Sequence, residues 1–252
     1  MTRAPLVLAG RTAVITGAGS GIGRALALHA AGLGMAVAMC DVDEAGLSET
    51  ATLLAVPHVA RLVDVTEPAE LERFAVAARR LPPVALLFAN AGILCQGSMI
   101  DFDPAMLSLI LSVNVVGAVA AVQAFLPALR ANTPAQIVIT ASTGAMVSYA
   151  HLAAYCASKH ALWPIAEGLR EDLTPDGIGV SMLMPGAVET GIFDASDPDH
   201  QPAPDSISPA EAARIAFAGA MADRPLILTH PHVIDRMRAR FDATLQNLAT
   251  PD

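Results

Sequence analysis

Charged residues and cysteines are scarce in this sequence, and each scarcity excludes some classes of protein. Of the 252 residues, 15% are charged and 54% are hydrophobic. This composition argues against disorder and favours an assembly that covers apolar surface. The formal net charge is −9, and no run of Lys or Arg occurs. Nucleic acid and anionic membranes are therefore not expected as partners.

The three cysteines, Cys40, Cys95 and Cys156, are scattered and form no C-x-x-C pair. They exclude a disulfide framework, and residues 1–10 lack the pattern of a signal peptide. Free thiols in a reducing cytoplasm are the expectation. His230 and His232 are two residues apart, and we expect them on opposite sides of an extended segment. Without a thiolate or carboxylate at ligand spacing they predict strand-end histidines and no metal site.

A long segment without charge runs from Pro104 to Leu129. It is long enough to cross a bilayer. However, Ser108, Asn114 and Gln123 interrupt it, and Gly and Ala dilute its hydrophobicity. We therefore expect a helix that is buried on most sides, partly by a neighbouring subunit.

Apolar runs alternate with helical patterns along the chain. This order predicts an α/β fold, a Rossmann-like doubly wound parallel sheet with helices on both faces, in a single domain over 1–252. An acidic, Pro-rich stretch predicts a mobile substrate loop around 191–210, before a capping box from Ser208 to Glu211. The expected strands are 12–16, 35–40, 59–63, 84–89, 136–140, 179–184 and 226–228, and the expected helices are 22–33, 67–80, 104–129 and 152–173.

A glycine-rich loop follows the first strand and opens the first helix. It contains Gly17, Ser20, Gly21, Ile22 and Gly23. Strand, glycine loop and helix in this order are the setting that a dinucleotide pyrophosphate requires, since free N–H groups and the helix dipole favour phosphate. The alternative is a glycine-rich turn without a ligand.

Asp41 ends the second strand, 24 residues after Gly17 (41 − 17). A carboxylate there can accept both adenosine ribose hydroxyls and repel a 2′-phosphate, which favours NAD over NADP. Arg24 competes with this interpretation, although we expect it to face solvent. Asp64 and Val65, at the next strand end, are placed to meet the adenine, unless Asp64 is a cap or turn residue.

Tyr155 and Lys159 stand one helical turn apart and so share a helix face. A free phenol has a pKa near ~10, and a neighbouring ammonium favours the phenolate that a base near neutrality requires. The pair alone is a weak signal, and its alternative is a helix-surface pair. Here it follows the glycine loop, Asn90-Ala91-Gly92, Asn114 and Ser142 in order.

These motifs resemble the short-chain dehydrogenase/reductase family over about Thr12 to Thr190. Its T-G-x-x-x-G-I-G motif matches 16–23, its N-A-G motif matches 90–92, and Ser142 precedes Tyr155 by 13 positions (155 − 142). The segment Pro185-Gly186-Ala187-Val188-Glu189-Thr190 matches the part that holds the nicotinamide. Ala89 stands where the family often has Asn. Pro164 replaces a small residue and should bend a helix that packs in the family's subunit interface.

The resemblance implies an NAD-dependent oxidoreductase that interconverts a secondary alcohol and a ketone. Tyr155 would be the general acid or base, and Lys159 would lower its pKa and bind the nicotinamide ribose. Ser142 would donate to the substrate oxygen, and Asn114 would hold a water that links Lys159 to solvent. The implied cofactor contacts are the glycine loop, Asp41, Asp64, Val65, Asn90, Ala91, Gly92, Tyr155, Lys159, Pro185, Gly186, Val188 and Thr190.

The substrate lining implied by the family layout is apolar, which suggests a hydrophobic or cyclic substrate. It comprises Leu94, Ser142, Met146, Tyr149, Ile192 and Phe193. Alternatively, some of these residues belong to the core. Family habit and the apolar excess imply a homodimer or homotetramer. A non-catalytic NAD sensor on the same fold would typically lack the Tyr or the Lys, and a halide-releasing or isomerising relative would alter the glycine loop or the P-G segment.

Overall fold

The computed structural model describes residues 4–193, 201 and 203–249. Its centre is a seven-stranded sheet in the order β3-β2-β1-β4-β5-β6-β7, in which every neighbouring pair is parallel. This confirms the predicted fold class. The strands are β1 Thr12–Thr16, β2 Ala36–Asp41, β3 His58–Leu62, β4 Val84–Ala89, β5 Ala135–Thr140, β6 Ile178–Met184 and β7 Leu226–Leu228. All seven were predicted to within a residue at each end, and β1, β4 and β7 match fully.

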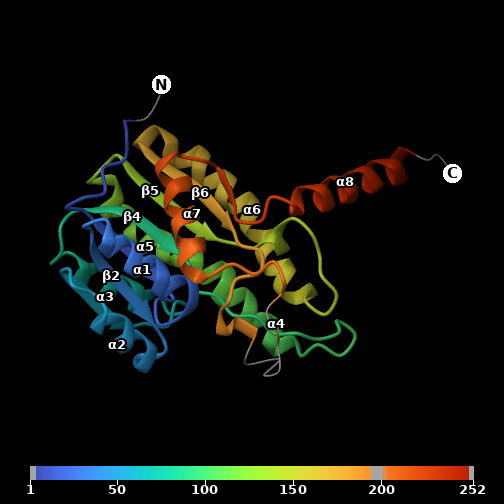
Figure 1. Cartoon of the computed structure of the whole chain (residues 1–252), viewed down its shortest axis with the longest axis horizontal. Coiled ribbons are helices and arrows are strands. Elements are labelled where there is room, and N and C mark those ends of the chain that lie inside the picture. Colours follow the sequence, from blue (N-terminus) through green and yellow to red (C-terminus); the bar gives the residue numbers. More distant parts are fainter. Residues whose placement is uncertain (1–3, 194–200, 202, 250–252) are drawn as a thin grey trace.

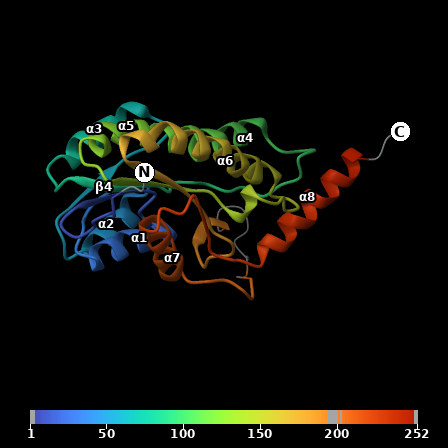
Figure 2. The ribbon, with the colours of Figure 1, turned by 90° about the horizontal axis from the view of Figure 1, so that it is seen from above.

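Helices cover both faces of the sheet (Figure 2). One layer holds α1 (Gly21–Gly32), α2 (Glu44–Thr52) and α7 (Pro209–Met221). The opposite layer holds α3 (Pro68–Ala78), α5 (Ala118–Arg130) and α6 (Ala153–Leu173). From β1 the chain adds strands first on one side, β2 and β3, and then on the other side, beginning with β4. In parallel sheets of this kind a crevice lies between the carboxyl ends of the two strands where the order changes side, here β1 and β4.

Buried aromatic side chains pack on both faces of the sheet. Phe74 of α3 meets Phe125 of α5 edge to face, with ring centroids 5.2 Å apart. On the other face, Phe217 of α7 packs on Phe88 of β4 at 5.0 Å. All four rings are fully buried, and each such burial stabilises the fold by roughly 1.5–3 kcal/mol. The two cores explain why the central strands carry apolar residues on both sides.

The charge-free segment forms α4 (Pro104–Leu111), a π-helical stretch η1 (Ser112–Gly117) and α5. Together, Pro104–Arg130 make one helix of the described chain that could cross a membrane by length and composition alone. Its most apolar stretch is 39% buried inside the chain. Leu109 is 46% and Val116 57% exposed. The expectation of burial on most sides is therefore not met within one chain, because an apolar face stays open.

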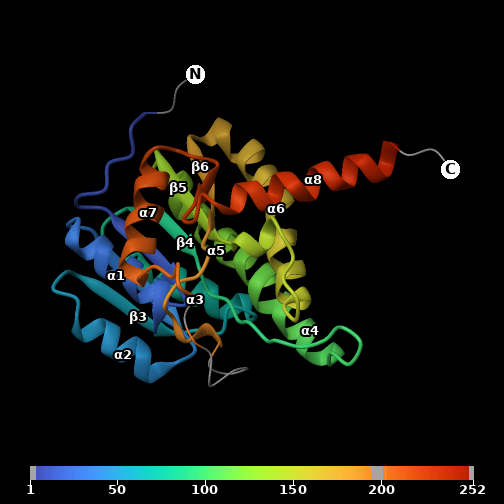
Figure 3. The ribbon, with the colours of Figure 1, turned by 45° about the vertical axis from the view of Figure 1, so that its right-hand side comes forward.

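Two helices had no counterpart in the sequence prediction, namely α2 and α8 (Val233–Ala249). α8 extends away from the body of the molecule (Figures 1 and 3). Pro164 lies inside α6, which continues to Leu173. Half of the predicted capping box is present, since Ser208 Oγ accepts the Glu211 N–H at 3.2 Å, whereas the Glu211 carboxylate binds Arg214. Residues 194–200 and 202 of the predicted substrate loop lie outside the described residues.

Candidate active site

Parallel strands bring the predicted cofactor residues to one edge of the sheet. The glycine loop follows β1, and Asn90 follows β4. Thr16 Oγ1 accepts the main-chain N–H groups of Asn90 and Ala91, each at 3.0 Å. In return, Asn90 Nδ2 donates to the Thr16 carbonyl at 3.1 Å. The N-A-G segment thus holds the glycine loop in place, a task that Thr16 shares although it was not predicted as a site residue.

The glycine loop is packed as a dinucleotide site would need. A Cβ atom on Gly23 would overlap the carbonyl oxygen of Gly17, so only glycine lets α1 start this close to β1. Ser20 is the exposed N-cap of α1, and its side chain makes no cap hydrogen bond. The first turn of α1 contains no acidic residue. Its free N–H groups therefore fit an incoming pyrophosphate.

Asp41 lies beside the loop, and its carboxylate is held from two sides. Oδ2 accepts the Gly19 N–H at 2.7 Å and Oδ1 accepts the Asp43 N–H at 3.0 Å. Each oxygen keeps a lone pair for a further donor such as a ribose hydroxyl.

Arg24 does not face solvent as expected. Its guanidinium binds Glu49 at 2.9 Å and Thr50 at 3.0 Å, on α2. It also donates to the Gly19 carbonyl at 2.5 Å. Because Glu49 balances its charge, Arg24 is poorly placed to act as a free cation for a 2′-phosphate.

Asp64 and Val65 follow β3. Asp64 Oδ1 accepts both the N–H and the hydroxyl of Thr66, at 2.8 and 2.7 Å. The turn role left open for Asp64 is thus present. Val65 is buried and lies against Gly117 of η1, where a Cβ would come within 2.7 Å of its side chain.

Ser142 and Tyr155 meet beyond the end of β5. Ser142 caps the short helix η2 (Thr143–Ala145) and accepts the Gly144 N–H at 3.0 Å. It also hydrogen-bonds to the Tyr155 side chain. Burial raises the pKa of Tyr155 to about 12, and the Ser142 hydrogen bond opposes this rise. Desolvation therefore outweighs the Ser142 hydrogen bond, and the lowering of the Tyr155 pKa by Lys159 stays a prediction.

Lys159 is also buried, with 2% of its surface exposed. Its Nζ donates to the Thr140 carbonyl at 2.9 Å and lies 5.6 Å from the Tyr155 ring centroid. Burial lowers the pKa of Lys159 to about 8, so the amine is charged at pH 7. One hydrogen bond to Thr140 uses one of three N–H donors, and the rest suit the hydroxyls of a bound ribose. Thr140 was not predicted, since a main-chain acceptor leaves no sequence signal.

Asn114 lies in the π-helical turn, whose wider winding brings its side chain inside. Its Oδ1 accepts the Ile93 N–H at 2.8 Å, and its Nδ2 donates to Ile93 O at 3.0 Å and to Ser158 Oγ at 2.9 Å. A Cβ on Gly92 would lie 3.2 Å from Asn114 Oδ1 and 3.3 Å from Lys159 Nζ. Asn114 thus joins the N-A-G segment to α6. Both N–H groups of the Asn114 side chain are used, so the expected water between Lys159 and solvent would have to bind another atom of Asn114.

The predicted substrate residues divide between core and surface. Leu94 and Met146 are buried, and Met146 belongs to the core on the α6 side. Tyr149 bonds to Thr143 Oγ1 through its hydroxyl at 3.1 Å, and the Arg236 guanidinium lies 4.7 Å from its ring centroid. Ile192 and Phe193 are half-buried in η4, Gly191–Phe193. For Met146 the core alternative fits better.

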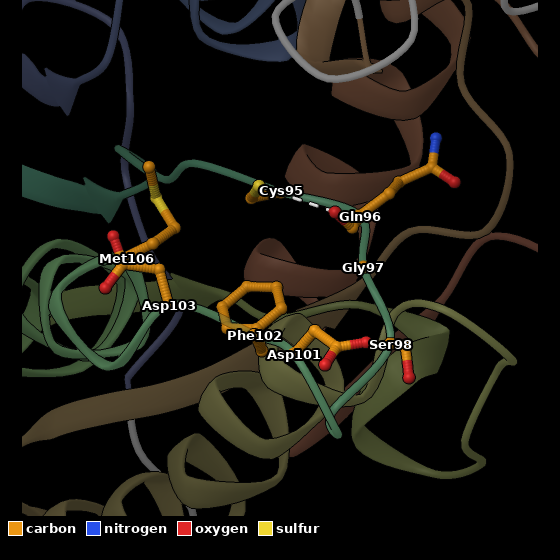
Figure 4. A pocket seen from close by; sticks show the side chains of 8 residues that line it. All are labelled: Cys95, Gln96, Gly97, Ser98, Asp101, Phe102, Asp103 and Met106. Carbon is orange, nitrogen blue, oxygen red and sulfur yellow. Dashed lines mark hydrogen bonds between the residues drawn. The ribbon is translucent and has the colours of Figure 1, made fainter.

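A cavity of about 440 Å³ is lined by residues of the segment that follows Leu94 in the chain (Figure 4). The loop that precedes α4 and the first turn of α4 form its wall. None of the predicted site residues lines it. The lining residues are Cys95, Gln96, Gly97, Ser98, Asp101, Phe102, Asp103 and Met106.

His230 and His232 follow β7, but the prediction that they point to opposite sides is wrong. Their rings meet edge to face, with centroids 5.7 Å apart. The prediction misapplied strand geometry, since residues two apart in an extended segment share one side, and the chain also turns after Leu228. Across residues 4–193, 201 and 203–249, no group of three or more His, Cys, Asp or Glu side chains is arranged to hold a metal ion.

Known proteins resemble the chain along most of its length. The short chain dehydrogenase family model matches residues 11–201. 1-deoxy-11-beta-hydroxypentalenate dehydrogenase from Streptomyces exfoliatus is 33% identical, over 96% of this chain and 90% of that protein. A short-chain dehydrogenase/reductase from Burkholderia phymatum, solved in complex with NAD, is 32% identical with a TM-score of 0.88, covering 97% of each chain.

A third similar protein is the 3-ketoacyl-(acyl-carrier-protein) reductase from Brucella melitensis, complexed with NADH. It is 28% identical with a TM-score of 0.82, over 88% of this chain and 98% of that one. The glycine loop, the Ser142–Tyr155–Lys159 group and these matches lead to one conclusion: the chain belongs to the short-chain dehydrogenase family of oxidoreductases.

Proposed function

We propose that the protein interconverts a secondary alcohol and a ketone with NAD, using Tyr155 as general acid and base. The observation that carries this proposal is the buried contact of Tyr155 with Ser142, with Lys159 5.6 Å from the phenol ring. The Ser142 hydroxyl, the Tyr155 phenol and the Lys159 ammonium thus lie close to one another beyond the end of β5. Such a group can move a proton at an oxygen atom and stabilise charge there.

The residues present fit a nicotinamide dinucleotide. The α1 N-terminus and the glycine loop would hold its pyrophosphate, Asp41 its adenosine ribose, and Lys159 its nicotinamide ribose. When bound, it would supply a hydride acceptor or donor. The preference for NAD over NADP rests on the Asp41 carboxylate and on the pairing of Arg24 with Glu49.

The protonation states decide what each residue does at neutral pH. With the pKa of Tyr155 raised to about 12, the phenol is neutral and ready to give a proton to a ketone oxygen. In the oxidative direction, Tyr155 must take up the alcohol proton, so it must first lose its own. The charged Lys159 and the Ser142 hydroxyl stabilise that phenolate. We therefore expect oxidation to speed up with rising pH until Lys159 loses its charge.

The substrate is proposed to be a hydrophobic or cyclic secondary alcohol. Support comes from the apolar residues Leu94, Ile192 and Phe193 near the strand ends, and from similarity to a dehydrogenase named for 1-deoxy-11-beta-hydroxypentalenate. A screen of cyclic and acyclic alcohols with NAD and with NADP, followed by absorbance at the NADH band, identifies the substrate and the cofactor. Preference for NADP would contradict the role given to Asp41.

Tyr155→Phe is the direct test of the mechanism. It keeps the ring and removes the hydroxyl, so turnover of a substrate found in the screen should fall at least ~1,000-fold. NADH binding, measured by fluorescence, should stay within a few-fold of the unmodified protein. Turnover within a few-fold would refute the mechanism. NADH binding without turnover of any alcohol or ketone would instead favour a cofactor sensor on the same fold.

A further inference from the structure

His230 is a buried residue for which the mechanism has no use, and its ring is bonded at both nitrogens. Its exposure is 5%. Nε2 lies 3.0 Å from the Asp205 carbonyl, and Nδ1 lies 2.7 Å from Thr229 Oγ1. Because a carbonyl only accepts, Nε2 carries a proton. In the neutral ring, Nδ1 then accepts the Thr229 hydroxyl proton.

Thr229 extends this chain of bonds to Gly186. The Gly186 N–H donates to Thr229 Oγ1 at 3.0 Å. A Cβ at Gly186 would lie 2.5 Å from His230 Nδ1, so the main chain of Gly186 rests directly against the imidazole. One continuous path thus joins Gly186, Thr229, His230 and the Asp205 carbonyl.

A second set of bonds joins the same two segments. Val188 and Ile207 form a parallel bridge. The Glu189 N–H donates to Ile207 O at 3.0 Å, and the Ile207 N–H donates to Ala187 O at 3.1 Å. His232 adds a contact, with its Nε2 3.2 Å from Asp205 Oδ2. His230 therefore lies between two segments that the main chain already aligns.

The segment 185–190 touches both halves of the candidate site. At its start, the Pro185 carbonyl accepts the Thr143 N–H at 2.8 Å and the Ser142 hydroxyl at 3.4 Å. At its end, the Thr190 side chain lies against the glycine loop, where a Cβ on Gly21 would come within 3.0 Å of Thr190 Cγ2. The position of this segment therefore sets the space between Ser142 and the loop.

We propose that His230 is a positioning residue that holds the 185–190 segment against β7 and the 205–207 segment, at the place required for the nicotinamide end of the dinucleotide. The proposal rests on the proposed function, because that function supplies the ligand. His230 acts through Thr229 and Gly186 and touches neither Tyr155 nor Lys159 in this arrangement. Its loss should loosen the segment without altering the proton-transfer group.

The two bonds of His230 can be separated by substitution. His230→Phe keeps a ring and loses both bonds, and we expect the NADH dissociation constant to rise about tenfold. His230→Asn keeps an acceptor near the Nδ1 position, and His230→Gln keeps a donor near the Nε2 position. Each should lose only about threefold, since one of the two bonds remains. NADH binding by His230→Phe within twofold of the unmodified protein would overturn the proposal.

Thr229 provides a matched pair of variants. Thr229→Val keeps the shape and removes the acceptor of the Gly186 N–H, so it should weaken NADH binding about tenfold. Thr229→Ser keeps the hydroxyl and should restore binding to within twofold. A merely structural role would show equal loss in both variants. Urea unfolding of each variant identifies any general loss of the fold.

Amide hydrogen exchange of the protein without nucleotide tests whether His230 holds the 185–190 segment in place. In His230→Phe, the amides of Gly186, Glu189 and Ile207 should exchange at least tenfold faster, while amides of β4 and β5 stay unchanged. Unchanged exchange at all three amides would show that His230 does not hold the segment. Suppose that exchange becomes faster in His230→Phe but the unmodified protein binds neither NADH nor NADPH. His230 would then hold the segment, but its role in dinucleotide binding and the proposed function would both be refuted.

Discussion

Lys159 Nζ donates to the Thr140 carbonyl at 2.9 Å while lying 5.6 Å from the centroid of the Tyr155 ring. The end of β5 thus holds the ammonium against the sheet, beside the phenol. Burial lowers the pKa of Lys159 to about 8 and raises the pKa of Tyr155 to about 12. Both shifts disfavour charge, so ionisation of either side chain costs stability.

Lys159→Met should make the protein more stable at pH 7. The pKa of Lys159 is lowered in the folded state to about 8 from 10.5, so the unfolded chain binds the proton more tightly between these values. The unmodified protein should gain stability from pH 8 to 10, and its deficit relative to Lys159→Met should shrink by about 2–3 kcal/mol. Urea unfolding at pH 7 and pH 10 measures this. A constant difference would show that burial imposes no such cost.

Ser142→Ala should slow the reaction in both directions, by about 100-fold or more, because the donor to the developing charge is lost. The Ser142 hydrogen bond also lowers the pKa of Tyr155. Its removal should therefore shift the rise of oxidation with pH toward higher pH. Ser142→Thr keeps the hydroxyl and serves as the control. An unshifted pH profile of the rate in Ser142→Ala would separate Ser142 from the titration of Tyr155.

Asp41→Ser should lower the preference for NAD over NADP at least about tenfold, because it removes a carboxylate that repels a 2′-phosphate. Asp43→Ser changes the same charge two residues away and is the matched control. The ratio of kcat/KM for the two cofactors measures the effect. Equal ratios in both variants would mean that general charge, and not a carboxylate at position 41, sets the preference.

Val116→Glu should prevent self-association. Val116 is exposed on the charge-free segment, and we expect a second copy of the chain to cover that face, as an apolar surface of this kind favours. Native mass should fall from a dimer or tetramer to the monomer, with circular dichroism unchanged. Leu53→Glu, on the exposed end of α2, is the control. A monomeric unmodified protein would contradict the expectation at once.

The strands were predictable because both faces of the sheet are covered, which requires apolar residues at consecutive positions. The family resemblance, carried by the order and spacing of the motifs, implied that Ser142 and Tyr155 act at one site. The surroundings of Arg24 were not predictable, since its partners Glu49 and Thr50 belong to a helix with little apolar periodicity. The raised pKa of Tyr155 likewise depends on burial, which a local spacing cannot report.

The loop at His230 shows a different limit. His230 and His232 were predicted to lie on opposite sides of a strand, but residues two apart in a strand lie on the same side. The chain also turns after β7, so strand alternation does not govern these two residues. The bonds that run from Gly186 through Thr229 and His230 to Asp205 join three segments far apart in the chain. A single sequence carries no local pattern for them.

The π-helical turn at Ser112–Gly117 adds a residue to one turn of an otherwise regular rod. Side chains before and after it are consequently out of phase with a simple 3.6-residue repeat. Removing one residue there would restore the ordinary winding and rotate Asn114 away from Ile93. The contact between the N-A-G segment and α6 therefore depends on chain length at this point as much as on the identity of the amide.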